Sequence, residues 1–168
     1  MPPTPTELET LRDHLSSKGV AYLMASFADM HGVSKTKMVP LSHIDQMMAG
    51  SELYTGAALD GVPQDVSDEE VSAHPDPQSC IILPWQTDVA WFASNLWCEE
   101  KPFDACSRNI LARATQAAAD MGFVMNFGME AEFYVLKDGE ADVVPVSERE
   151  TLDKPCYDGY CALDNLLW

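Results

Sequence analysis

The chain has 168 residues, 46% of them hydrophobic, so it is long enough and apolar enough to fold around a packed core. Its 27 Asp and Glu residues against 10 Lys and Arg give a formal net charge of -17. A surface this acidic repels the phosphate backbone of nucleic acids and the anionic headgroups of lipids. We therefore expect neither nucleic acid nor a membrane as a partner. No apolar run spans a bilayer and residues 1–10 lack signal-peptide features, which predicts a cytoplasmic protein.

The first elements predicted along the chain are a helix and a hairpin. Residues 4–19 open with the cap signal Thr-Pro-Thr-Glu, carry leucines at helical spacing and end at a glycine, which predicts a helix. Residues 20–28 and 33–40 have strand composition and flank the turn sequence DMHG. We therefore expect these two strands to pair as a β-hairpin.

A short helix and a long loop are predicted next. Residues 41–50 have the pattern of a short helix with Ser42 as its N-cap and Gly50 at its end. Residues 59–78 are rich in Gly, Pro, Asp and Ser, which predicts a surface loop. Loops of this length are uncommon in compact domains unless they are functional or disordered, so this one needs an explanation.

The second half of the chain returns to regular structure. Residues 80–85 and 87–97 have strand composition, which adds strands to the sheet. Residues 107–122 predict a strong amphipathic helix with Ser107 as its N-cap and Gly122 at its end. The stretch NFGMEAEFYVL, residues 126–136, then predicts one more strand.

Two carboxylates share one face of this last predicted strand. Residues two apart in a strand point the same way and lie about 7 Å apart, so Glu130 and Glu132 would be neighbours. Ionised acids this close repel each other unless a cation or solvent lies between them. A rigid Glu-x-Glu pair offers the oxygen ligands that Mg²⁺ and Mn²⁺ prefer. A solvated strand face is the alternative, and the commoner one for an isolated Glu-x-Glu.

The surroundings of this pair resemble the glutamine synthetase family. The order of helix, glycine, strand, Glu-x-Glu and aromatic in AAADMGFVMNFGMEAEFYVL is similar to the start of that family's catalytic domain. FADMHGVSKTKMVP resembles the hairpin of its N-terminal β-grasp domain, and LDGVPQD resembles its Asp-Gly loop. FDACSRNIL and DKPCYDGYCALDNLL resemble two later segments, so the resemblance runs from about Val20 to the C-terminus and leans toward the branch that makes γ-glutamylmethylamide.

The resemblance implies an α+β fold in two parts. Residues 1–102 would form a β-grasp-like N-terminal domain, and residues 103–168 would form the first helix and strand of a glutamine synthetase-type catalytic domain. Because the chain ends at Trp168, before the family's remaining glutamate and arginine motifs, we expect a truncated catalytic domain that is inactive by itself.

The resemblance also implies a function. Glutamine synthetases are ATP-dependent ligases of glutamine biosynthesis and nitrogen assimilation, and they join glutamate to ammonia or an amine through γ-glutamyl phosphate. They form ring-shaped homo-oligomers with active sites between subunits. The functional alternative is a stand-alone, non-catalytic binding or assembly module derived from the same family.

Three residues receive roles from the resemblance. Glu130 would bind Mg²⁺ or Mn²⁺ near the phosphates of ATP, and Glu132 would bind a second ion on the glutamate side. Asp60, in the Asp-Gly loop, would bind and deprotonate the ammonium or amine across a subunit interface. Asp65 lies in the same loop and competes with Asp60 for this role, and the aromatic residue that many family members carry after the loop is absent here.

Overall fold

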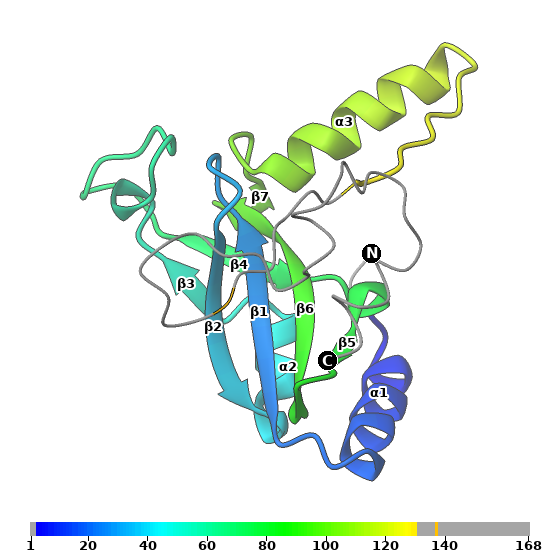
Figure 1. Ribbon diagram of the computed structural model, residues 1–168. Helices are drawn as coiled ribbons and strands as arrows, with labels where there is room; N and C mark the ends of the chain where they lie inside the picture. Colours follow the sequence, from blue (N-terminus) through cyan, green and yellow to red (C-terminus); the bar gives the residue numbers. More distant parts are fainter. Residues whose placement is uncertain (1–2, 131–136, 138–168) are drawn as a thin grey trace. The chain divides into compact units, whose positions relative to one another are not determined.

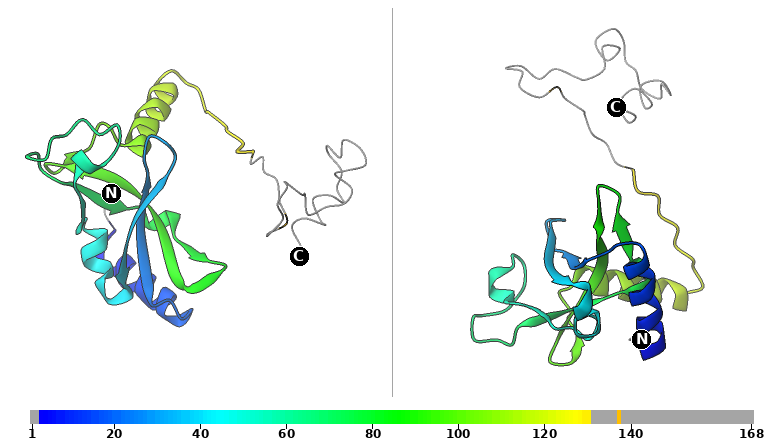
Figure 2. Two further views of the ribbon diagram at one scale, coloured as in Figure 1. Left: turned by 60° about the vertical axis from the view of Figure 1, so that its left-hand side comes forward. Right: turned by 90° about the horizontal axis from the view of Figure 1, so that it is seen from below.

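The computed structural model describes residues 3–130 and Lys137. The chain divides into two compact units, Met1–Met125 and Asn126–Trp168, and every helix and strand given below lies in the first. Figure 1 shows this unit as a curved sheet with α1 and α2 at one end and α3 at the other. The left view of Figure 2, turned by 60° about the vertical axis, shows the same arrangement.

The described elements alternate between short helices and strands. The helices are α1 (Pro5–Ser17), α2 (Ile44–Met48) and α3 (Ser107–Asp120), and the 3-10 turns are η1 (Leu41–His43), η2 (Gly56–Ala58) and η3 (Pro77–Ser79). The strands are β1 (Tyr22–Ala28), β2 (Ser34–Pro40), β3 (Glu52–Tyr54), β4 (Val71–Pro75), β5 (Ile81–Leu83), β6 (Gln86–Cys98) and β7 (Lys101–Pro102).

The strands form one mixed sheet in the order β2-β1-β6-β4-β3, with β5 and β7 also paired to β6. The pair β1 and β6 is parallel, and the other pairs are antiparallel. The hairpin predicted from residues 20–40 is confirmed as β1 and β2, with Tyr22 opposite Pro40 and Ala28 opposite Ser34. The long strand β6 is therefore the centre of the sheet.

The two ends of the strand order meet, so the sheet nearly closes into a barrel. The Lys37 ammonium of β2 donates a hydrogen bond to the Leu53 carbonyl of β3 and lies 5.1 Å from the centre of the Tyr54 ring. The Tyr54 hydroxyl in turn donates to the Ala25 carbonyl of β1, at 3.2 Å. These contacts join strands that are not neighbours in the sheet, which the strong curvature makes possible.

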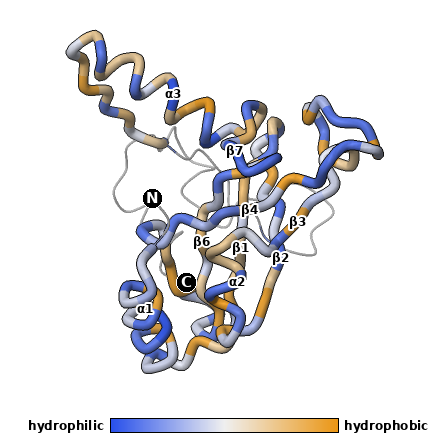
Figure 3. The backbone as a smooth tube through the Cα atoms, turned by 180° about the vertical axis from the view of Figure 1, so that it is seen from behind, coloured by the Kyte–Doolittle hydropathy of each residue, from blue (hydrophilic) through white to orange (hydrophobic). Residues whose placement is uncertain are grey.

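The core lies between the curved sheet and the helices α1 and α2. Figure 3 shows hydrophobic residues concentrated along β1, β6 and α2. The largest fully buried side chains include Phe92 of β6 and Leu23 of β1, and burial of such a side chain stabilises a fold by about 1.5–3 kcal/mol. The helices contribute Leu15, Ile44, Met47 and Met48 to the same cluster.

The predicted first helix is confirmed as α1, and its capping explains where it begins. The Thr4 hydroxyl accepts a hydrogen bond from the Glu7 backbone N–H, while the Glu7 carboxylate accepts one from the Thr4 backbone N–H at 2.7 Å. The Thr4 backbone N–H and the Thr4 hydroxyl both donate to the Glu7 carboxylate, and these two bonds lower the pKa of Glu7 below its ordinary value. The helix ends just before Gly19, whose φ of +81° suits the left-handed region that stops a helix.

Both serine caps predicted from the sequence are wrong. Residues 41–43 already form η1, so Ser42 lacks the extended backbone that an N-cap needs, and α2 follows directly. The N-cap of α3 is Cys106, because Ser107 is already helical and its hydroxyl donates instead to the Ala28 carbonyl, at 2.8 Å. The end of α3 before Gly122 is confirmed.

The loop predicted over residues 59–78 is wrong in its second half. Val71–Pro75 form β4, which pairs with β3 on one side and β6 on the other. Its residues alternate between buried and half-buried, with Val71, Ala73 and Pro75 buried. The prediction failed because small and polar residues mask this alternation, and the pairing partners that bury it lie far away in the sequence.

No helix within the described residues is long and apolar enough to cross a bilayer.

Candidate functional site

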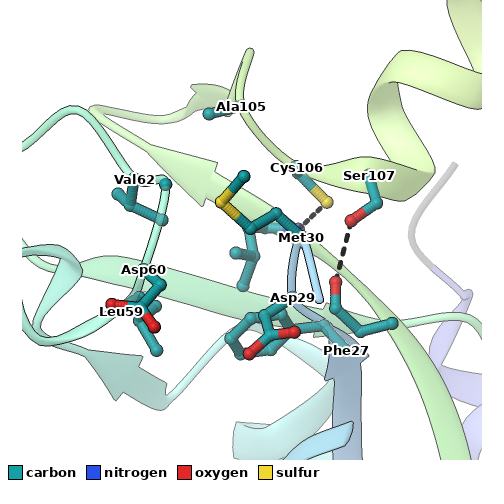
Figure 4. A pocket seen from close by; sticks show the side chains of 12 residues that line it. Phe27, Asp29, Met30, Leu59, Asp60, Val62, Ala105, Cys106 and Ser107 are labelled. Carbon is teal, nitrogen blue, oxygen red and sulfur yellow. Dashed lines mark hydrogen bonds between the residues drawn. The ribbon is translucent and has the colours of Figure 1, made fainter. Parts of the chain in front are cut away.

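A pocket lies where three segments of the first unit meet (Figure 4). The segments are the turn between β1 and β2, the loop that follows η2, and the residues that lead into α3. Apolar side chains and two carboxylates line it together: Phe27, Met30, Leu59, Val62, Leu96 and Cys106 with Asp29 and Asp60. Asp60, the residue to which the family resemblance gives a catalytic role, therefore lines this pocket.

Asp29 has a structural role in the β1–β2 turn. Its side chain is only 5% exposed and accepts hydrogen bonds from the backbone N–H groups of His31 and Val33, both at 2.9 Å. The Lys35 ammonium lies 3.3 Å away. Burial raises the pKa of Asp29, but these two N–H groups and the ammonium outweigh it and hold the pKa below its ordinary value. Asp29 is therefore an ionised carboxylate that holds the backbone of the β1–β2 turn in place.

Asp60 has the opposite character. Its side chain is 82% exposed, and its carboxylate oxygen Oδ2 lies 3.4 Å from His31 Nε2. An exposed carboxylate such as this one can bind an ammonium ion and can accept a proton from that ion. These are the two properties that the sequence-based hypothesis requires of Asp60.

The structure separates Asp60 from its competitor, Asp65. The Asp65 backbone N–H donates to the Asp68 carboxylate at 2.8 Å, and the Asp68 N–H donates to the Asp65 carbonyl, so the two form a local turn. Asp65 does not line the pocket that contains Asp60. Of the two candidates, Asp60 is the one placed beside the hairpin and the start of α3.

Gly61 allows the loop to approach the hairpin. Its φ of +75° lies in the left-handed region, which a residue with a side chain rarely adopts. A Cβ built on Gly61 would lie 1.9 Å from the sulfur of Met30, so the methionine side chain lies directly against the glycine backbone. Sequence reasoning did not connect Met30 with the Asp60 loop, because no local pattern links the turn with a loop thirty residues later.

The first turn of α3 forms a wall of the pocket and is fixed by polar contacts. Arg108 Nε donates to the Asn95 side chain of β6 at 2.8 Å, and Arg108 also pairs with Asp76 at 3.2 Å. The buried Asn109 amide donates to the carbonyls of Leu96, at 2.8 Å, and Phe103, at 2.9 Å. The start of α3 is thereby attached to the centre of the sheet.

The predicted metal ligands belong to the other unit of the chain. Glu130 follows residues 123–129 in a stretch without helix or strand, so the described part of the predicted strand, residues 126–130, is not paired. Glu132 lies outside the described residues. Among residues 3–130 and 137, no three His, Cys, Asp or Glu side chains gather closely enough to hold a metal ion. The metal roles of Glu130 and Glu132 stay predictions, since the structure describes one of the two.

Comparisons with known proteins agree on one family. Residues 104–166 match the profile described as "Glutamine synthetase, catalytic domain". The chain is 34% identical over 144 residues to glutamine synthetase from Rhizobium leguminosarum bv. phaseoli, an overlap of 84% of this chain and 32% of the relative. It is 31% identical over 145 residues to glutamate–methylamine ligase from Methyloversatilis universalis, covering 86% of this chain and 33% of the relative.

A solved structure supports the same relationship. GmaS, a glutamate–methylamine ligase, in complex with ADP aligns with a TM-score of 0.62 and 32% sequence identity, over 66% of this chain and 26% of the GmaS chain. The chain spans about a third of the length of the curated relatives it matches. The sequence-based resemblance is confirmed, and the chain belongs to the glutamine synthetase family.

Proposed function

We propose that this chain forms the N-terminal part of an ATP-dependent ligase that joins glutamate to ammonia or a small amine through γ-glutamyl phosphate. The observation that carries the proposal is the identity of 34% and 31% to a glutamine synthetase and a glutamate–methylamine ligase over more than four fifths of this chain. The ADP bound to GmaS supports ATP as the co-substrate.

The proposal gives Asp60 the task of binding the protonated amine and accepting its proton. An amine attacks an acyl phosphate only after it has lost a proton, and a carboxylate within hydrogen-bond reach can take that proton. Asp60 is exposed on a loop that contacts the hairpin, so its carboxylate is accessible to a second subunit. This geometry suits a residue that acts in the active site of a neighbouring subunit in a homo-oligomeric ring.

The proposal also assigns the two parts of the chain. Residues 1–102 correspond to a β-grasp-like N-terminal domain, which the curved mixed sheet and the parallel pair β1 and β6 support. Residues 103–168 correspond to the beginning of the catalytic domain, which the family match over residues 104–166 supports. Ser107, Arg108 and Asn109 would then connect the two domains.

Divalent ions belong to the same proposal. The carboxylates of Glu130 and Glu132 are hard oxygen donors of the kind that Mg²⁺ and Mn²⁺ select, and they would hold the ions. Such ions, when bound, neutralise phosphate charge during phosphoryl transfer. In this proposal, the carboxylates of Glu130 and Glu132 fix the position of the ions.

The test is an assay on the assembly that contains this chain, isolated from its source through an affinity tag. ADP release is measured with ATP, Mg²⁺, glutamate and either ammonia or methylamine, and each component is omitted in turn. We expect release that requires both glutamate and an amine. Failure of every amine to increase ADP release would overturn the ligase proposal and favour a non-catalytic module.

A further inference from the structure

We infer that the β1–β2 turn positions the Asp60 loop, with His31 as a positioning residue for the Asp60 carboxylate and Met30 as a cover on Gly61. The inference deepens the proposed function, because the position of Asp60 matters for catalysis only if Asp60 serves the amine. The contact itself is independent of any substrate. It joins the turn and the loop at two adjacent positions on each side.

The first contact joins His31 to Asp60. Nε2 of His31 lies 3.4 Å from Oδ2 of Asp60, so that oxygen faces the imidazole and Oδ1 is left for a ligand. His31 is 56% exposed in its side chain, but its backbone is fixed, because its N–H donates to the buried carboxylate of Asp29 at 2.9 Å. The Lys35 ammonium holds the same carboxylate from β2. A chain of contacts thus runs from the sheet to Asp60.

The second contact joins Met30 to Gly61. Met30 is 67% exposed, yet its sulfur occupies the space where a Cβ on Gly61 would lie. The loop adds two short bonds of its own, from the Leu59 N–H to the Gly56 carbonyl and from the Val62 N–H to the Leu59 carbonyl. Asp60 and Gly61 therefore form the tip of a small turn that lies against the hairpin.

A group that transfers a proton reacts faster when its position is fixed. A loop attached only at its ends samples many positions, and a displacement of about 1 Å of a reacting group can cost about 10²-fold in rate. The turn restricts the Asp60 loop without covering the carboxylate, which stays 82% exposed. This combination of restraint and access is what we assign to His31 and Met30.

The two contacts differ in kind. The charged groups that face His31 are Asp60 from the loop and Asp29 from its own turn, with Lys35 paired to Asp29. The first contact needs a hydrogen-bond donor at position 31 and an acceptor at position 60. The contact of Met30 with Gly61 needs only an apolar side chain of sufficient length.

The test measures hydrogen exchange of the Val62 amide in the ¹⁵N-labelled 168-residue chain by nuclear magnetic resonance, at one fixed pH for every variant. His31→Ala and Asp60→Ala should each raise the exchange rate several-fold. The double variant should exchange no faster than either single variant, because both substitutions remove the same contact. His31→Gln, which keeps a side-chain donor, should retain most of the wild-type protection.

The matched control is His14→Ala, because His14 lies on α1 and not in the β1–β2 turn. This variant should leave the exchange rate of the Val62 amide unchanged. Met30→Ala should raise that rate several-fold, while Met30→Leu should not. Unchanged signals from β1 and β6 in each variant show that the sheet is intact.

The inference is overturned if the Val62 amide exchanges at the wild-type rate in His31→Ala, or if His31→Ala and His14→Ala behave alike. The readout uses no ATP, glutamate or amine. An unchanged exchange rate would thus reject the positioning role and leave the ADP-release result standing, while absence of ADP release would reject the ligase proposal and leave the loop contact standing.

Discussion

The sheet and helix α3 are stabilised in opposite ways. The sheet buries Leu23 and Phe92 completely against α1 and α2, so its apolar residues find their partners inside the first unit. Of the fourteen residues of α3 only Asn109 is buried, and Ile110 and Leu111 are 49% and 60% exposed. Hydrophobic burial holds the sheet together, whereas hydrogen bonds in a single turn hold α3.

The sheet is therefore stabilised by contacts within its own unit, whereas most of α3 has no buried contact within the described residues. An exposed helix of this length is marginally stable in water, although a sequence rich in alanine favours it. Its apolar stripe is uncovered within the described residues. The predictions that follow test where the stability of the unit resides, from the largest expected effect to the smallest.

Phe92→Ala should cost the most, because it opens a cavity at the centre of the sheet. We expect the free energy of unfolding to fall by about 3–5 kcal/mol, measured by urea denaturation. Leu111→Ala, a truncation of an exposed apolar side chain on α3, should change it by less than about 0.5 kcal/mol. Comparable losses in the two variants would show that α3 is buried in solution.

Asn109→Ala should detach the start of α3. The substitution leaves the carbonyls of Leu96 and Phe103 without their side-chain donor, which we expect to cost about 1–3 kcal/mol. Hydrogen exchange should accelerate first in α3 and only later in β6. Gln116→Ala is the control, since Gln116 is exposed and bonds only within α3, and a loss of the same size there would contradict the anchor.

Tyr54 should titrate late, because burial and the nearby Glu52 carboxylate raise its pKa from 10.0 to about 12. Its folded pKa is higher than its unfolded pKa, so its contribution to stability is complete below about pH 10 and is lost as the pH rises through about 12. Phenolate absorbance should therefore show a late step that disappears in Tyr54→Phe. This variant should cost about 1 kcal/mol through the bond to Ala25, and a late step that survives it would refute the assignment.

Thr4→Ala should have the smallest effect, because it removes an exposed capping box. We expect the free energy of unfolding to fall by about 0.5–1 kcal/mol. Thermal unfolding followed by circular dichroism would measure it. Thr6→Ala, on the same exposed helix but outside the cap, should be neutral or slightly stabilising, and a greater loss there than in Thr4→Ala would contradict the assignment of the cap.

Local signals in the sequence predicted elements whose determinants are local. The capping box and leucine spacing located α1, and strand composition around DMHG located β1 and β2. Strand β4 was missed because its burial comes from β3 and β6, which are distant in sequence. The serine caps failed because Ser42 and Ser107 lie inside helical turns whose starts depend on tertiary contacts.

The candidate site was predicted only in part for the same reason. Asp60 was found through its resemblance to a known loop, and the structure places it in a pocket. Its partners, Met30 and His31, were not connected to it because the contact depends on how the loop folds back onto the hairpin. The assignments of Glu130 and Glu132 stay predictions from the sequence.

The most direct test of the ligase assignment compares Asp60→Ala with Asp65→Ala in the assembly that contains the chain. We expect Asp60→Ala to lower kcat/KM for the amine by about 10²-fold or more and to leave the KM for ATP unchanged, because the proposal assigns binding and deprotonation of the amine to this carboxylate. Asp65→Ala should change kcat/KM by no more than about twofold, as its turn lies outside the pocket. Equal losses, or no loss in Asp60→Ala, would contradict the role assigned to Asp60.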